Sequence, residues 1–214
     1  MISRIPPNIK VYDSFLNEEE HLYLTQHSSK VKSYANKEQN NYPLIISATE
    51  EWSQDYLQKD FRLQLIFTKF INAFQNFEQN LIFGSIEYWF IFSNLSKGEP
   101  ISTTHGAHFD DNKWTIKNEN EIKSPSIIAI FYLHTTPTAL RVFNYDFNDR
   151  QNLQVKSQNI SNFLDVECSG NRLVIFRGEK MHGVFGKLNE TETVQRVGLV
   201  FNLWEESPQR PWWF

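Results

Sequence analysis

The stretch His105-Gly106-Ala107-His108-Phe109-Asp110 lies in the middle of this 214-residue chain and contains the spacing His108-x-Asp110. On a β-strand, the side chains at positions i and i+2 point to the same face, so this imidazole and this carboxylate would converge on one point. We interpret the pair as two of three ligands of a metal site, which needs one further histidine from elsewhere in the chain.

A third ligand is available later in the sequence. His182 follows the apolar run 172–176, and fourteen residues after it Arg196 opens a second apolar run, 197–204. Two histidines and one carboxylate on one face leave three open positions on an octahedral ion, which suits non-haem Fe(II) oxygen chemistry. The spacing His-x-Asp arises often by chance, but the ordered set that ends with Arg196 is more specific.

This ordered set resembles the 2-oxoglutarate/Fe(II)-dependent oxygenases, and within them the prolyl-hydroxylase-like branch. The resemblance extends loosely over residues 85–204. It implies that His108, Asp110 and His182 are the catalytic iron ligands, and that Arg196 holds the distal carboxylate of the co-substrate 2-oxoglutarate. It also implies O₂ as the second co-substrate, with ascorbate as a supporting reductant.

The resemblance suggests two tyrosines and one arginine as further site residues. Tyr88 and Tyr132 are candidates for hydrogen bonds to 2-oxoglutarate, although a buried tyrosine that merely finds a carbonyl partner is an equally good interpretation. Arg141 could bind an anionic group of the substrate, but a surface ion pair is the simpler interpretation. Thr138-Ala139 replaces the Gly-Gly that often precedes this strand in the branch, so prolyl specificity is not carried over.

Two further substrate-binding candidates surround the His-x-Asp pair. His105 faces away from His108 on a continuous strand, so it would lie outside the ligand set, yet it is the one rival for a ligand position. Trp114 lies in the polar stretch 111–124, which in such oxygenases often closes over the substrate. A solvated connector is the alternative interpretation of this stretch.

Local patterns predict helices first and strands afterwards. Asn17 with Glu20 three residues later predicts a helix over about 17–30, and residues 33–48 predict a loop. Apolar side chains recur at steps of three and four over about 50–77, which predicts one helix or two with a break near Asp60. An extended piece is expected at 9–12, and alternating side chains from residue 84 onward predict strands, the first over about 86–93. The further expected strands are 127–133, 140–143, 163–168, 172–176 and 196–204.

Short strands with turns between them favour an antiparallel sandwich or barrel. The resemblance specifies a double-stranded β-helix, or jelly roll, that is mainly β with buttressing helices (α+β). We expect one domain over 1–214, with a helical support at about 13–80 and a jelly-roll core at about 84–204. The aromatic tail 207–214 would either pack back on this domain or meet a partner subunit in a homo-oligomer.

The net charge of −4 and a pI near 5.9 argue against a nucleic-acid partner, which normally binds a basic face. Cys168 is the single cysteine, and the sequence contains neither a signal-peptide core nor a membrane-spanning run, so we expect a cytoplasmic protein. The predicted activity is hydroxylation of an amino-acid side chain in a peptide or protein, or of a small metabolite. The alternatives are a catalytically inactive jelly-roll binding protein and, less favoured, a zinc hydrolase that would use His105, His108 and Asp110.

Overall fold

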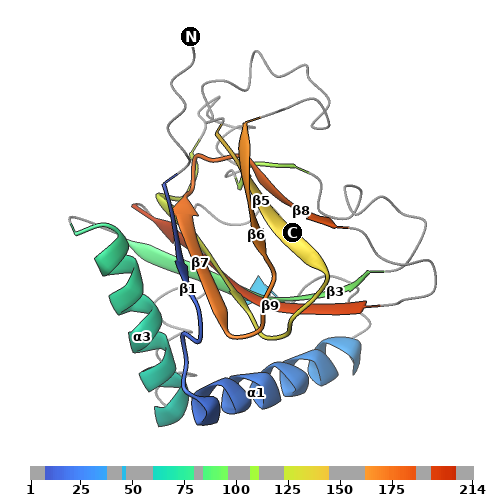
Figure 1. Ribbon diagram of the computed structural model, residues 1–214. Helices are drawn as coiled ribbons and strands as arrows, with labels where there is room; N and C mark the ends of the chain where they lie inside the picture. The colour runs from blue at the N-terminus through green and yellow to red at the C-terminus, as the bar shows by residue number, and fades with distance from the viewer. Residues whose placement is uncertain are drawn as a thin grey trace.

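The computed structural model describes residues 8–37, 45–46, 60–79, 84–95, 107–110, 123–144, 162–186 and 194–205. Within these residues the chain forms two helices and nine strands (Figure 1). The helices are α1 (Glu18–Lys37) and α3 (Phe61–Phe77). The strands are β1 (Ile9–Tyr12), β2 (Ile45–Ile46), β3 (Ser85–Leu95), β4 (Ile127–Tyr132), β5 (Thr138–Phe143), β6 (Phe163–Glu167), β7 (Arg172–Arg177), β8 (His182–Gly186) and β9 (Val194–Trp204).

The strands form two antiparallel sheets. The larger sheet has the order β1-β7-β4-β9-β3-β2 and the smaller sheet the order β6-β5-β8. Because successive side chains point to opposite faces, a central strand such as β4 supplies two separate cores. Ile128 and Ile130 of β4 pack between the two sheets, whereas Ala129 and Phe131 pack on the side of the helices. This arrangement confirms the predicted jelly roll with buttressing helices.

The helices cover the face of the larger sheet that points away from the smaller sheet (Figure 1). Phe70 of α3 is fully buried, and its ring centroid lies 4.7 Å from that of Phe201 on β9 and 5.3 Å from that of Phe131 on β4. Phe67 and Phe74 of the same helix also contact Phe201. The aromatic stripe of the predicted helix therefore packs on a sheet, as its period indicated. Neither described helix is long and apolar enough to span a membrane.

Both described helices begin at a capping side chain, and the first of these starts was predicted. The Glu20 N–H donates to the Asn17 side chain over 2.9 Å, and the Asn17 N–H donates to the Glu20 carboxylate over 3.1 Å, so the two residues form a reciprocal capping box. Asp60 caps α3 by accepting a hydrogen bond from the Leu63 N–H over 3.1 Å. The predicted break near Asp60 is thus the start of α3, and residues 50–59 lie outside the described part.

The loop predicted over 33–48 is wrong at two places. Helix α1 continues to Lys37, and Ile45–Ile46 pairs with β3. The buried stripe of α1 runs through Leu24, Ser28 and Val31 at steps of four and three, and the polar Ser28 within it weakens the apolar pattern of the sequence.

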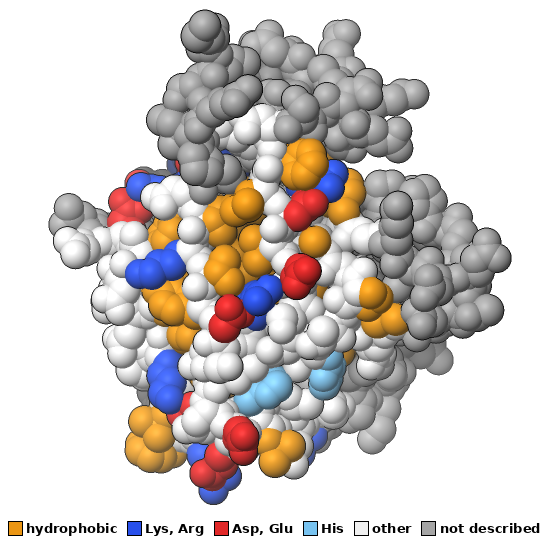
Figure 2. Space-filling view, viewed as in Figure 1, with side chains coloured by type: hydrophobic (Ala, Val, Ile, Leu, Met, Phe, Trp, Pro, Cys, Tyr) orange, Lys and Arg blue, Asp and Glu red, His pale blue; other side chains and the backbone are white. Residues whose placement is uncertain are grey.

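Strand β8 was not predicted, because two of its five residues are glycine and weaken the local strand signal. Strand β8 forms because it pairs with β5 and, through His182, with His108 of the segment 107–110. On the face shown in Figure 2, hydrophobic side chains gather over the region of the edge strands β1 and β6. Val11 of β1 and Leu164 of β6 are 39% and 41% exposed.

Candidate metal centre

Backbone pairing brings the two predicted histidine ligands together. The His108 N–H donates to the His182 carbonyl over 2.8 Å, and the His182 N–H donates to the His108 carbonyl over 2.9 Å. The pairing extends the smaller sheet past β8, although residues 107–110 form this single bridge and not the strand that we expected. A Cβ at Gly183 would lie 3.1 Å from the backbone of Ala107, so glycine at this position lets the two segments approach.

The side chains of His108, Asp110 and His182 converge on one point. The His108 Nε2 lies 3.3 Å from the Asp110 Oδ1, and the His182 Nε2 lies 3.9 Å from the same oxygen. One ligand atom from each residue lies within 4.8 Å of the other two, in the group of possible metal ligands found among the described residues. Two ligand atoms each about 2.1 Å from an octahedral ion lie about 3 Å apart, so the three side chains can hold one metal ion.

The charges of this group suit a divalent cation. Burial lowers the pKa of His182 to about 4, and the neighbouring His108 acts in the same direction. Burial by itself would raise the pKa of Asp110, but the hydrogen bond from His108 and the charge of His182 when protonated bring it down to about 2. Near neutral pH the imidazole of His182 is therefore neutral and the carboxylate ionised, so protons do not compete with a metal ion.

The second nitrogen of the His182 ring is also held. The His182 Nδ1 lies 3.1 Å from the Lys180 carbonyl oxygen, which fixes the proton on Nδ1 and leaves the Nε2 lone pair directed at Asp110. The site is asymmetric, because the His182 side chain is 5% exposed and the His108 side chain 43% exposed. Access to the centre is therefore from the side of His108.

A buried cation faces the same space between the sheets. Alternation along β9 puts Arg196 on the face of Val200, which belongs to the core between the sheets, and of Asn202, which contacts Asp110. Arg196 is 2% exposed, and its guanidinium carbon lies 5.7 Å from the ring centroid of Tyr132. Within the described part of the chain, the Arg196 Nε has no hydrogen-bond partner.

A second hydrogen-bond donor that could bind an anion lies close to Arg196. The Tyr132 hydroxyl is also buried without a hydrogen-bond partner among the described residues. Burial raises the pKa of Tyr132 well above its ordinary value, so the hydroxyl stays protonated and can donate. A guanidinium and a neighbouring hydroxyl donor fit a carboxylate group.

Comparisons with known proteins find the fold but no near relative. No family model and no curated protein matches the chain. A prolyl-4-hydroxylase from Pseudomonas putida aligns with 94% of this chain and 89% of its own, at a TM-score of 0.50 and 17% identity. A prolyl 4-hydroxylase from Phytophthora capsici aligns at a TM-score of 0.57 and 14% identity over 94% of this chain and 61% of its own.

A third solved structure comes from a different pathway. The non-haem α-ketoglutarate-dependent epimerase SnoN of nogalamycin biosynthesis aligns with 91% of this chain and 77% of its own, at a TM-score of 0.51 and 7% identity. The chain has the fold of the 2-oxoglutarate/Fe(II)-dependent oxygenases. The resemblance that the sequence suggested is thus confirmed at the level of the fold.

Within this oxygenase fold, Tyr88 and Tyr132 lie on opposite faces of the larger sheet. Tyr132 faces Arg196, whereas Tyr88 packs on the helix side, with its ring centroid 4.8 Å from that of Phe67. The expectation that Tyr88 contacts 2-oxoglutarate is corrected here, because the sheet separates its ring from Arg196. The sequence could not decide this point, since both faces of β3 are apolar.

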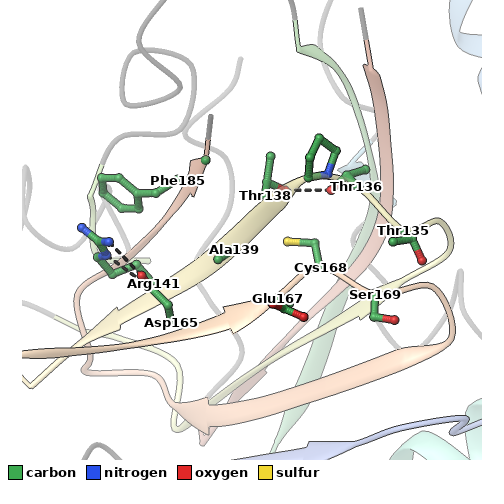
Figure 3. Close-up of a pocket in the computed structure, with 12 residues that line it drawn as sticks. Thr135, Thr136, Thr138, Ala139, Arg141, Asp165, Glu167, Cys168, Ser169 and Phe185 are labelled. Carbon is green, nitrogen blue, oxygen red and sulfur yellow. Dashed lines mark hydrogen bonds and ion pairs between the residues drawn. The ribbon is translucent and has the colours of Figure 1, made fainter. Parts of the chain in front are cut away.

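Arg141 lies on the outer face of the smaller sheet, opposite to the core residue Val142 next to it. Its Nε and Nη2 donate to the two carboxylate oxygens of Asp165 over 2.7 and 2.8 Å, and its guanidinium carbon lies 3.6 Å from the ring centroid of Phe163. The ion-pair interpretation is thereby confirmed. Figure 3 shows this pair among the residues that line a pocket, together with Thr138 and Cys168. The volume of this pocket is about 440 Å³.

His105 and Trp114 lie outside the described residues, so their predicted roles near the substrate stay predictions, as does the role of the tail 207–214. The structure adds one residue that sequence reasoning missed. The Asn202 Nδ2 donates to the Asp110 Oδ2 over 3.2 Å. The available signal was a polar residue within the apolar run 197–204, an even number of positions after Arg196 and hence on the same face.

Proposed function

We propose that this protein is a non-haem Fe(II)- and 2-oxoglutarate-dependent dioxygenase that hydroxylates its substrate. The observation that carries the proposal is a triad of two imidazoles and one carboxylate in the same interior space as the buried guanidinium of Arg196, whose Nε has no hydrogen-bond partner among the described residues. Three protein ligands leave three positions of an octahedral ion open, enough for a chelating co-substrate beside O₂. Iron bound there would supply the oxidising chemistry.

Three side chains of this protein would bind the iron, and a backbone carbonyl would orient one of them. The His108 Nε2, the His182 Nε2 and the Asp110 Oδ1 would hold the iron, since these three atoms face one another. Lys180 keeps the His182 ring in its ligand orientation through Nδ1. Because His182 and Asp110 need no change of protonation near neutral pH, the site is ready for metal without rearranging its charges.

Arg196 and Tyr132 would bind the distal carboxylate of 2-oxoglutarate. Burying a guanidinium whose Nε has no partner among the described residues is costly, and a carboxylate would relieve this cost with a bidentate, charge-assisted contact. The Tyr132 hydroxyl would donate to the same carboxylate. Ascorbate would serve only to keep the iron reduced.

The substrate would approach from the side of His108 and β3. Trp89 and Ile91 of β3 point into the space between the sheets and are half-buried, whereas Tyr88 and Phe90 on the other face are buried. This partly open apolar wall supports an organic substrate, either an amino-acid side chain of a peptide or protein or a small metabolite. We also propose a cytoplasmic location, which the lone cysteine Cys168 supports.

Release of succinate from 2-oxoglutarate tests the proposed activity. The purified protein with Fe(II), O₂ and 2-oxoglutarate should decarboxylate the co-substrate slowly, and a panel of peptides and metabolites should be screened for acceleration. Asp110→Ala should abolish the reaction, because it leaves two protein ligands. Without O₂, Fe(II) and 2-oxoglutarate should give a weak visible absorption band that His182→Ala loses. Absence of both succinate and the band in the wild-type protein would refute the proposal.

A further inference from the structure

Asn202 occupies a position where the larger sheet fixes it on both sides. It lies in the middle of the sheet, opposite Glu87 of β3 and Ile128 of β4, and it is 3% exposed. Its Nδ2 donates to the Asp110 Oδ2 over 3.2 Å. Because the backbone of Asn202 is paired on both sides, the amide is a rigid support for the Asp110 carboxylate.

The two oxygens of Asp110 have different surroundings. Oδ1 faces both imidazoles, at 3.3 Å from the His108 Nε2 and 3.9 Å from the His182 Nε2, whereas Oδ2 is bound by Asn202. We propose that Asn202 is a positioning residue that restricts Asp110 to binding the metal through Oδ1 alone. The proposal rests on the metal site of the proposed function and adds a role that the ligand triad does not specify.

The restriction matters because the metal has few open positions. With two histidines and one carboxylate oxygen, three positions of an octahedral ion stay open. If both oxygens of Asp110 were bound, two positions would stay open, and a chelating co-substrate would fill them. By holding Oδ2, Asn202 would keep the third position available for O₂.

Stability does not explain an amide at this position. The neighbouring residues Val200, Phe201 and Leu203 are apolar and buried, so an apolar side chain would also fit this strand. The Asn202 Oδ1 is buried with no hydrogen-bond partner in the described part of the chain, which makes the amide costly to bury. The contact with Asp110 is therefore the feature that accounts for an amide at this position.

The test counts the water ligands on a bound metal ion, without turnover. The wild-type protein loaded with Mn²⁺ in ¹⁷O-enriched water should show three exchangeable waters by electron–nuclear double resonance. Asn202→Leu keeps the volume of the side chain but removes the donor, so it should show two. Val200→Ala, on the same strand and face without contact to Asp110, should keep three. Two waters in the wild type, or three in Asn202→Leu, would overturn the proposal.

A split between binding and turnover gives a second readout. Asn202→Leu should bind 2-oxoglutarate almost as the wild type does, because a chelate still finds two positions, while turnover falls about ten- to a hundredfold, the usual effect of losing an outer partner of a metal ligand. If Asn202→Leu does not fold, Asn202→Ala takes its place, and the wild-type water count alone can still overturn the proposal. Three waters in the wild type, with neither succinate release nor the visible absorption band, would defeat the proposed function and leave this inference standing.

Discussion

Replacing Arg196 with methionine is the sharpest test of the co-substrate site. Arg196 is 2% exposed, and its Nε has no partner among the described residues, so its guanidinium would meet a carboxylate in a nearly dry space. Losing such a charge-assisted contact costs about 2–5 kcal/mol, and at about 1.4 kcal/mol per tenfold change this raises the dissociation constant of 2-oxoglutarate about 30-fold to 4000-fold. Arg196→Lys keeps the charge without the fork and should fall between the wild type and Arg196→Met.

Titration of 2-oxoglutarate at saturating metal ion measures this effect directly. Arg141→Met is the matched control, because Arg141 pairs with Asp165 on the outer face of the smaller sheet and should leave the dissociation constant unchanged. Without ligand, Arg196→Met should unfold at the same temperature as the wild type or higher, since the cost of burying a cation is removed. A change in the dissociation constant that is no larger in Arg196→Met than in Arg141→Met would refute the assignment of the carboxylate anchor.

Three further predictions follow from burial and packing. The free energy of unfolding of the metal-free protein should fall by roughly 3 kcal/mol as the pH drops from 6.5 to about 4. The reason is that His182 takes up a proton in the unfolded chain at a higher pH than in the folded one. In His182→Gln, the free energy of unfolding from urea titrations should depend less on pH over this range. Gly183→Ala should push away the neighbouring ligand segment and weaken Mn²⁺ binding about tenfold or more by calorimetry, whereas Gly170→Ala, in a distant turn, should not. Phe70→Ala should cost about 3–5 kcal/mol in urea unfolding, against little for Phe61→Ala, whose side chain is 69% exposed.

Several features could be predicted from the sequence because they are local. The spacing His108-x-Asp110 needs only two residues of extended chain to bring both side chains to one face. Asn17 with Glu20 forms a capping box within one helical turn, and Asp60 caps the next described helix. The alternation of β3 follows from strand geometry. These interactions join residues close in sequence, so they can be predicted without knowledge of the fold.

Only the tertiary structure shows which face of each strand points toward the metal ligands and Arg196. Both faces of β3 are apolar, so alternation could not tell that Tyr88 belongs to the helix side, while Tyr132 of β4 reaches Arg196. The pairing of His108 with His182 joins segments far apart in the chain, and Asn202 becomes visible only through its contact with Asp110. Such contacts depend on the order and register of the strands. Order and register are set by packing over the whole chain, so no short stretch of sequence predicts them.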